Sequence, residues 1–250
     1  MTNLRVALCV FLSAGLVVGC ASAASPTETI APSAGPTVVT SPSISPTDAA
    51  PPSPASLGSV ERPLDAGTYR VDLDQLAGGG TGFPAFVATV PDGWHTFDGW
   101  NVYRDQVAVQ FWNLDQVFGH PCQWDGTLFQ PGPTVDDLTE ALVKIPLRNA
   151  TKPIDVTLDG YAGKYLEWSV PSDMDFSTCD AADGEHHFES WTGKGWAHDR
   201  YHQGPGQVDR LWILDIDGSR LVIDAFSMPS ATAEERAELL SVVKSIRFER

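Results

Sequence analysis

The sequence predicts an α+β fold, in which an antiparallel β-sheet has two main helices covering it on one face, after a disordered tether. Three observations lead to this prediction. Residues 21–60 are Pro, Ser, Thr or Ala at 30 of 40 positions, so they bury too little apolar area to offset the entropy of ordering. Segments of strand type, some joined by Asp-Gly turns, then recur along the chain. Helix caps open one segment in the middle and one near the end.

The first 19 residues are typical of an export signal. Arg5 precedes an apolar run over 6–18 that is short for a membrane-spanning helix. The run ends in Val17-Val18-Gly19-Cys20, which resembles the bacterial lipobox, where the cysteine is diacylated and becomes the new N-terminus. We therefore expect a signal peptide over 1–19 and acyl chains such as palmitate on Cys20. Cleavage after Ala21-Ser22-Ala23 is the alternative and would release the protein.

Residues 20–60 are predicted to form the lipidated tether. A Pro-rich chain of this length reaches on the order of 100 Å when extended, at about 3.1 Å per residue. Two or more acyl chains give stable membrane binding, whereas one chain is marginal. The expected location is therefore the extracytoplasmic face of the cell membrane, with the membrane as a partner through the lipid anchor.

Residues 61–250 are interpreted as a single acidic extracytoplasmic domain. The whole chain has a formal net charge of −16, and Arg5, Glu28 and Asp48 are the only charged residues before position 61. The domain therefore carries nearly all of the negative charge. Because proteins that bind nucleic acid need a basic surface to neutralise phosphates, nucleic acid is excluded as a partner.

Two cysteines remain for the domain. Cys9 leaves with the signal and Cys20 takes the lipid, so Cys122 and Cys179 form an even pair in an oxidising compartment. We predict that they are disulfide-bonded. The alternative is a reactive thiol beside His120, but the CxxC spacing of a redox site is missing.

The first half of the domain contains three segments of strand type, over 68–73, 85–90 and 107–113. Thr134, followed by carboxylates, predicts the N-cap of a helix. The predicted buried face of this helix, which Pro146 stops, consists of Val135, Leu138, Leu142 and Ile145.

The second half contains two predicted hairpins. One pairs 154–158 with 161–170 around Asp159-Gly160, and the other pairs 211–216 with 220–226 around Asp217-Gly218. Thr232 and Glu235 form a capping box that opens the last helix. This helix is expected to bury Ala237, Leu240 and Val243, and to lead into a closing strand over 246–249.

Seven motifs between residues 85 and 249 resemble a group of uncharacterised actinobacterial exported proteins and lipoproteins. They are Val90-Pro-Asp-Gly-Trp94, Pro121-Cys-Gln-Trp124, Gly132-Pro-Thr-Val-Asp-Asp-Leu138, Asp159-Gly-Tyr-Ala-Gly-Lys-Tyr165, Gly204-Pro-Gly-Gln207, Leu211-Trp-Ile-Leu-Asp-Ile-Asp-Gly218 and Ser245-Ile-Arg-Phe-Glu249. The resemblance implies export and lipidation but no activity. The first and last motifs are also similar to PsbP-like domains, which implies an antiparallel sheet flanked by helices and a scaffold or partner-binding role.

The sequence contains no catalytic motif that assigns a reaction. It lacks G-x-S-x-G, H-E-x-x-H and the P-loop, so we assign no catalytic residue and no cofactor. The predicted function is a non-catalytic binding or scaffolding module of the cell envelope. The alternative is a hydrolase acting on cell-wall polymers or their precursors, with Glu167 and Asp224 as its carboxylate pair.

The predicted binding surface is a Gly-rich segment with aromatic and imidazole side chains. Trp191 and Trp196 are expected to be exposed and to bind a glycan or an envelope protein, because flat aromatic faces suit such ligands, whereas Trp112, Trp168 and Trp212 are expected to be buried. The predicted surface also contains His186, His187, His198 and His202.

The same region contains two groups of residues that could bind a metal ion. The histidines could bind zinc together with Glu185 or Asp199, and the six carboxylates between 173 and 189 could bind calcium. The spacing fits neither an EF-hand nor a helical histidine pair, so we interpret both as solvated surface and assign no metal.

Overall fold

The computed structural model describes residues 53–76, 79–195 and 199–250. The predicted signal peptide, Cys20 and the tether up to residue 52 lie outside the described residues, and so do Trp196 and His198. In the described part of the chain, no helix has the length and apolar character needed to cross a membrane.

A central sheet of eight strands forms the middle layer, and every neighbouring pair in it is antiparallel. In spatial order its strands are β10 (Ile154–Leu158), β11 (Tyr161–Ser169), β16 (Val208–Ile216), β17 (Ser219–Ser227), β7 (Val107–Trp112), β6 (Asn101–Arg104), β5 (Trp94–Phe97) and β2 (Arg62–Leu64).

Both predicted hairpins are confirmed. β10 pairs with β11 through Asp159-Gly160, and β16 pairs with β17 through Asp217-Gly218. Asp217 and Gly218 have φ values of 51° and 89°. Positive φ at both central residues is the type I′ turn that matches the twist of the flanking strands.

Smaller sheets flank the central one. The second sheet consists of β1 (Ala55–Ser56), β3 (Gly67–Val71), β4 (Phe86–Val90) and β18 (Arg247–Phe248), and the third of β15 (Asp199–Tyr201), β14 (Glu189–Gly193), β8 (Leu114–Phe118) and β9 (Leu128–Phe129). A two-stranded ribbon consists of β12 (Ala181–Ala182) and β13 (Glu185–His186). Because β1 pairs with β3 and Leu57 is buried, the folded domain extends upstream of residue 61 into the predicted tether.

Both predicted helix caps are confirmed. Thr134 and Thr232 each form a capping box, with Asp137 and Glu235 respectively. The helical elements are α1 (Leu73–Leu76), α2 (Val135–Val143), the 3₁₀ turn η1 (Phe176–Thr178) and α3 (Ala233–Ser245). The buried face of α3 consists of Glu235, Leu239, Val242 and Val243. The prediction for Ala237 was wrong, because α3 is rotated so that this residue is exposed.

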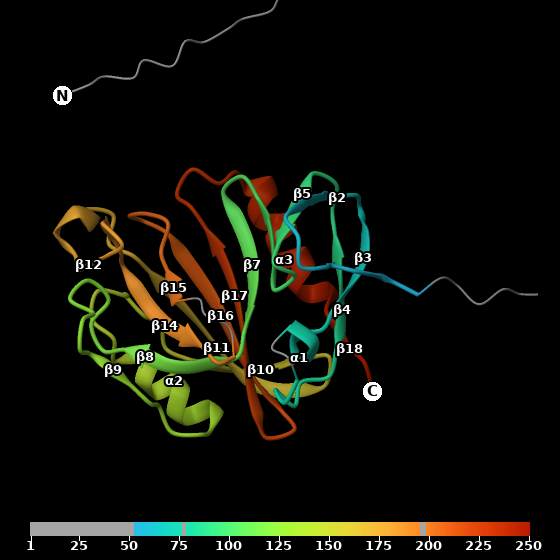
Figure 1. The fold of residues 1–250 in the computed structure, drawn as a ribbon, viewed down its shortest axis with the longest axis horizontal. Helices are drawn as coiled ribbons and strands as arrows, with labels where there is room; N and C mark the ends of the chain where they lie inside the picture. Colours follow the sequence, from blue (N-terminus) through green and yellow to red (C-terminus); the bar gives the residue numbers. More distant parts are fainter. Residues whose placement is uncertain (1–52, 77–78, 196–198) are drawn as a thin grey trace, which may run out of the picture. The chain divides into compact units, whose positions relative to one another are not determined.

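The expectation of one covered face was also wrong. Leu221, Ile223 and Ala225 of β17 lie in one core with α3, whereas Val222 lies in another with α2, because successive side chains of a strand point to opposite faces. Figure 1 shows α3 and α2 on different sides of the central strands. Each helix covers part of one face. β3 and β4 contribute to the first core and β8 and β14 to the second.

Candidate functional site

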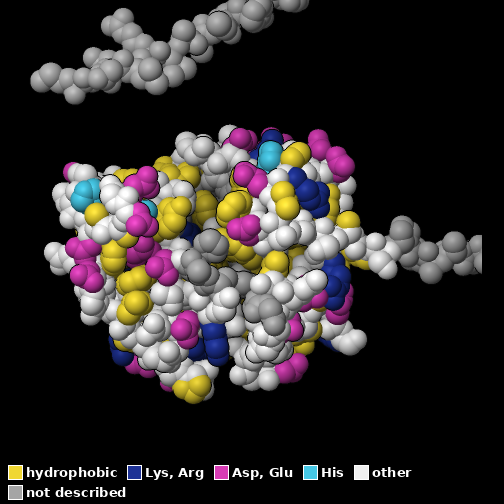
Figure 2. Space-filling model, in the orientation of Figure 1, with side chains coloured by type: hydrophobic (Ala, Val, Ile, Leu, Met, Phe, Trp, Pro, Cys, Tyr) yellow, Lys and Arg dark blue, Asp and Glu magenta, His cyan; other side chains and the backbone are white. Residues whose placement is uncertain are grey.

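Two adjoining cavities form a groove at the junction of β5, β6 and β7 with β15. They have volumes of about 190 and 670 Å³ and share five lining residues, which define what we call the central groove: Phe97, Asn101, Gln110, Tyr201 and Gln203. Figure 2 shows a hollow bordered by hydrophobic side chains in this part of the domain. Phe97 and Tyr201 are 40% and 45% exposed, so two aromatic rings are available at the surface.

Strand register places polar side chains in a row across the floor of the groove. Asn101 of β6 lies opposite Gln110 of β7, which in turn lies opposite Asp224 of β17. Directly opposed residues in antiparallel strands share one face. The Oδ1 atom of Asn101 accepts a hydrogen bond from the backbone N–H of Phe97 at 3.0 Å, and Oε1 of Gln110 accepts one from Trp112 Nε1 at 3.3 Å. These bonds fix the orientation of both amides.

A buried ion network joins this floor to the wall formed by β15. Arg200 lines the smaller cavity, and its guanidinium donates to Asp224 Oδ2 at 2.7 Å and to Asp209 Oδ1 at 2.8 Å. The three side chains are 2% exposed or less. Since Asp209 belongs to β16 and Asp224 to β17, Arg200 ties the edge strand β15 to two central strands.

The network continues through a second arginine. His202 Nε2 lies 2.8 Å from Asp209 Oδ2, and Arg148 NH1 lies 3.1 Å from His202 Nδ1. Arg148 also donates to Ser190 Oγ at 2.6 Å and lies over the ring of Trp168 at 4.6 Å. Arg148 NH1 also lies 3.0 Å from His202 Nε2, and Nδ1 lies 3.3 Å from the carbonyl oxygen of Phe188, so Arg148 contacts both nitrogens of the ring.

Burial shifts the pKa values of this network. Burial raises the pKa of Asp224 to about 7, although the guanidinium of Arg200 acts in the opposite direction. Burial and the nearby carboxylate of Asp199 raise the pKa of Glu189 to about 7. Burial and the guanidinium of Arg148 lower the pKa of His202 to about 3. The imidazole is therefore neutral at pH 7, and two guanidinium groups, on Arg148 and Arg200, face the carboxylates of the network.

Ser190, His202 and Asp209 lie in the order of a hydrolase triad. Ser190 Oγ is 3.3 Å from His202 Nδ1, on the side of the ring away from Asp209. However, Ser190 is 1% exposed, and the side chain of His202 is 0% exposed. A nucleophile has to contact its substrate, so this arrangement acts as part of the buried network in the observed conformation.

The predicted aromatic platform is wrong for Trp191. Its side chain is 0% exposed and packs between Trp112 and Trp168, with ring centroids 6.0 and 5.9 Å away. Trp112 and Trp168 are buried as expected, whereas Trp212 is only partly buried and packs against Tyr165. Trp191 is buried because its strand β14 lies between β8 and β15 and packs into the second core.

The predicted histidine cluster is divided in the structure. His202 is buried in the ion network, which corrects the expectation of a surface side chain. His186 is exposed, and its Nδ1 lies 2.6 Å from the carbonyl oxygen of Cys179. His187 packs edge-on against Tyr201, with ring centroids 5.0 Å apart, so it lies next to the groove.

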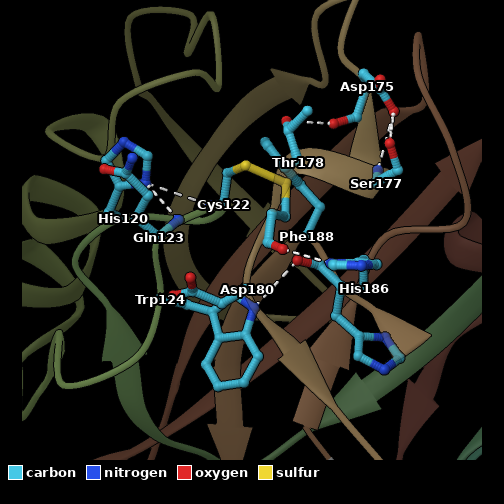
Figure 3. The surroundings of a disulfide bond; sticks show 12 residues. His120, Cys122, Gln123, Trp124, Asp175, Ser177, Thr178, Asp180, His186 and Phe188 are labelled. Carbon is cyan, nitrogen blue, oxygen red and sulfur yellow. Dashed lines mark hydrogen bonds between the residues drawn. A yellow bond between two sulfur atoms is a disulfide. The ribbon is translucent and has the colours of Figure 1, made fainter. Parts of the chain in front are cut away.

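The predicted disulfide is confirmed. Cys122 and Cys179 are bonded with their Cα atoms 4.4 Å apart, and both are nearly fully buried. Figure 3 shows His120 beside this bond, where its Nδ1 accepts hydrogen bonds from the backbone N–H groups of Cys122 and Gln123. Among the described residues, no group of three His, Cys, Asp or Glu side chains is arranged to hold a metal ion.

The carboxylate pair considered for a hydrolase is not brought together. Glu167 lies opposite Arg210, which lies opposite Ala225, whereas Asp224 is the next residue of β17. Adjacent residues of a strand point to opposite faces, so Glu167 and Asp224 are on opposite sides of the sheet. Glu167 instead accepts a hydrogen bond from Tyr165.

The groove, Arg148 and Arg200 are not among the predicted site residues. The available signal was a charged residue inside each of several apolar strands, such as Asp224 in Leu221-Val-Ile-Asp-Ala-Phe226. No protein-family model matches the chain, and a search of curated proteins finds no match to it.

Proposed function

We propose that this chain is an extracytoplasmic lipoprotein, anchored by acyl chains on Cys20, whose domain is a non-catalytic binding module of the cell envelope. The N-terminal sequence supports the location, because a short apolar run ends in a lipobox-like cysteine and is followed by a Pro-rich tether. The resemblance to exported actinobacterial lipoproteins is consistent with it.

The central groove is the observation that carries the binding function. It combines exposed aromatic rings with oriented amides, whereas the carboxylates and the imidazole beneath it are buried and paired with one another. Concave sites with aromatic walls and a few placed polar groups are typical of ligand binding. The groove, rather than the Trp191 segment, is therefore the proposed binding surface.

A photocrosslinking amino acid tests this proposal in intact cells. It is placed at Tyr201 in the full-length chain, and at Phe129 as a control, because Phe129 is 38% exposed and does not line the groove. We expect crosslinked products of defined size from position 201 and not from position 129. Equal crosslinking at the two positions would rule out the groove as the binding surface.

The predicted carboxylate pair of a hydrolase is on opposite faces of the sheet, so a hydrolase would instead have to use the Ser190, His202 and Asp209 arrangement. A fluorophosphonate probe reacts with activated serines, so it distinguishes the two functions. The binding proposal predicts that the folded chain is not labelled, because Ser190 is 1% exposed. Labelling that Ser190→Ala removes would establish a hydrolase instead.

A further inference from the structure

We infer that the central groove binds a neutral glycan, an inference that rests on the proposed binding function and names its ligand class. The first observation is the type of polar group in the groove. Three of its five defining residues, Asn101, Gln110 and Gln203, are uncharged amides. Since the carbonyl oxygens of Asn101 and Gln110 already accept hydrogen bonds, their NH₂ groups are the donors offered to a ligand. Within the described chain, those NH₂ groups make no hydrogen bond.

The second observation is that the arginine lining the groove is already matched by carboxylates within the chain, whereas Glu61 and Asp105 have weaker partners. Arg200 is held by Asp209 and Asp224. Glu61 accepts a hydrogen bond from Tyr103 at 2.7 Å. Asp105 lies 3.7 Å from the guanidinium of Arg104, and Asp199 also has a partner.

This matching decides the charge of the ligand. A phosphate or carboxylate needs an available cation or a cluster of free N–H groups, and the arginine of the groove is fully engaged by carboxylates. The hydroxyl of Tyr103 does not neutralise Glu61, so the groove keeps negative charge, which further disfavours an anion. The groove therefore disfavours an anionic ligand.

The third observation is the arrangement of the aromatic rings. Phe97 and Tyr201 line both cavities and are 40% and 45% exposed, whereas Trp112 and Phe226 each line one cavity but are buried. Phe97 and Tyr201 are therefore the rings that carry this argument. An aromatic ring offers a flat apolar face, and a sugar ring has a complementary face of C–H groups with hydroxyl groups around its edge. A chain of neutral sugars matches both the rings and the amide donors of the floor.

Direct binding of defined sugars tests the inference. The probes are neutral glucan, mannan, galactan and chitin oligosaccharides, with polygalacturonate as the anionic comparison, and binding to the full-length chain is measured by calorimetry. We expect at least one neutral probe to bind. Tyr201→Ala and Gln110→Leu should each weaken that binding at least about tenfold, whereas Tyr201→Phe should retain it, because it keeps the ring. Phe129→Ala is the control and should change nothing. Preference for polygalacturonate over every neutral probe would overturn the inference.

Selective destruction of the ligand separates this inference from the proposed function. Cell-envelope material is treated with periodate, which cleaves vicinal diols, or with protease, and is then captured by the wild-type chain and by Tyr201→Ala. Groove-dependent capture that is lost after periodate and retained after protease supports a glycan. Groove-dependent capture that only protease removes overturns the glycan and keeps the binding function. Capture that Tyr201→Ala does not reduce overturns both.

Discussion

Replacing Arg200 by Met should destabilise the domain strongly, because it leaves two carboxylates buried without their cation. The guanidinium lies 2.7 Å from Asp224 and 2.8 Å from Asp209, and the exposed fractions of these carboxylate side chains are 0% and 1%. Removing one partner of a buried ion pair costs about 3 to 5 kcal/mol. Arg210→Met is the matched control, because Arg210 is partly exposed and lies 3.5 Å from Glu167. A pair of that kind contributes less than about 1 kcal/mol.

The cost of Arg200→Met should also depend on pH. Without Arg200, the pKa of Asp224 rises above the value of about 7 that it has in the native domain. The folded state then binds a proton that the unfolded state releases above about pH 4. The stability of the variant should therefore rise as pH falls from 8 toward 5, and Asp224→Asn in the same background should recover part of the loss at pH 8.

Urea unfolding followed by tryptophan fluorescence measures these differences. The expected order of stability at pH 7.5 is wild type, then Arg210→Met, then Arg200→Met with Asp224→Asn, then Arg200→Met. If Arg200→Met unfolds on its own, Arg200→Met with Asp224→Asn still tests the network, since it should be clearly less stable than Arg210→Met at that pH. Arg200→Met and Arg210→Met variants of equal stability would refute the assigned role of the buried network.

Three further predictions concern other parts of the chain. Cys20→Ser should move the protein from the membrane fraction to the medium or block its processing, and unchanged fractionation with an unmodified N-terminus beyond residue 20 would contradict lipidation. Replacing Cys122 and Cys179 together by Ala should lower the free energy of unfolding by roughly 4 kcal/mol, because the bond spans a sequence separation of 57 residues. Urea unfolding measures this difference. Wild type unfolded in the presence of reductant should lose a similar amount of stability. For Glu189, the pKa is raised from 4.5 to about 7, so ionisation costs folded-state stability as pH rises through this interval. The free energy of unfolding of Glu189→Gln relative to wild type should therefore increase by about 2 to 3 kcal/mol between pH 5 and pH 8. A difference in urea midpoints that does not change with pH would contradict the assignment.

Local signals in the sequence predicted the local elements well. The turn at Asp217-Gly218 and the cap at Thr232 depend on residues within a few positions of each other, so one sequence is enough to find them. The buried face of α3 was predicted less well. The predicted pair Leu240 and Val243 has the same i, i+3 spacing as the buried pair Leu239 and Val242. Helical periodicity alone does not decide which of these two overlapping apolar faces is buried.

The buried network could not be predicted in the same way. Its members come from β14, β15, β16, β17 and the segments after α2 and β15, and burial of each charge is favourable only because a partner from another segment is present. In the sequence, Asp224 has the pattern of a carboxylate on the outer face of a half-buried strand. In the structure, both faces of β17 are covered, so the same residue needs a cation.

The network gives a physical reason for the shape of the groove. β15 has three residues and lies at the edge of its sheet, where a strand of this length is held by few backbone hydrogen bonds. Arg200 lies at its centre and is fixed by ion pairs to β16 and β17, so Tyr201 next to it is held on the wall of the groove. A binding site that is ordered before the ligand arrives loses less conformational entropy on binding. In the proposed function, the buried charges would therefore contribute to binding by positioning the wall of the groove, without direct contact between the ligand and Asp209 or Asp224.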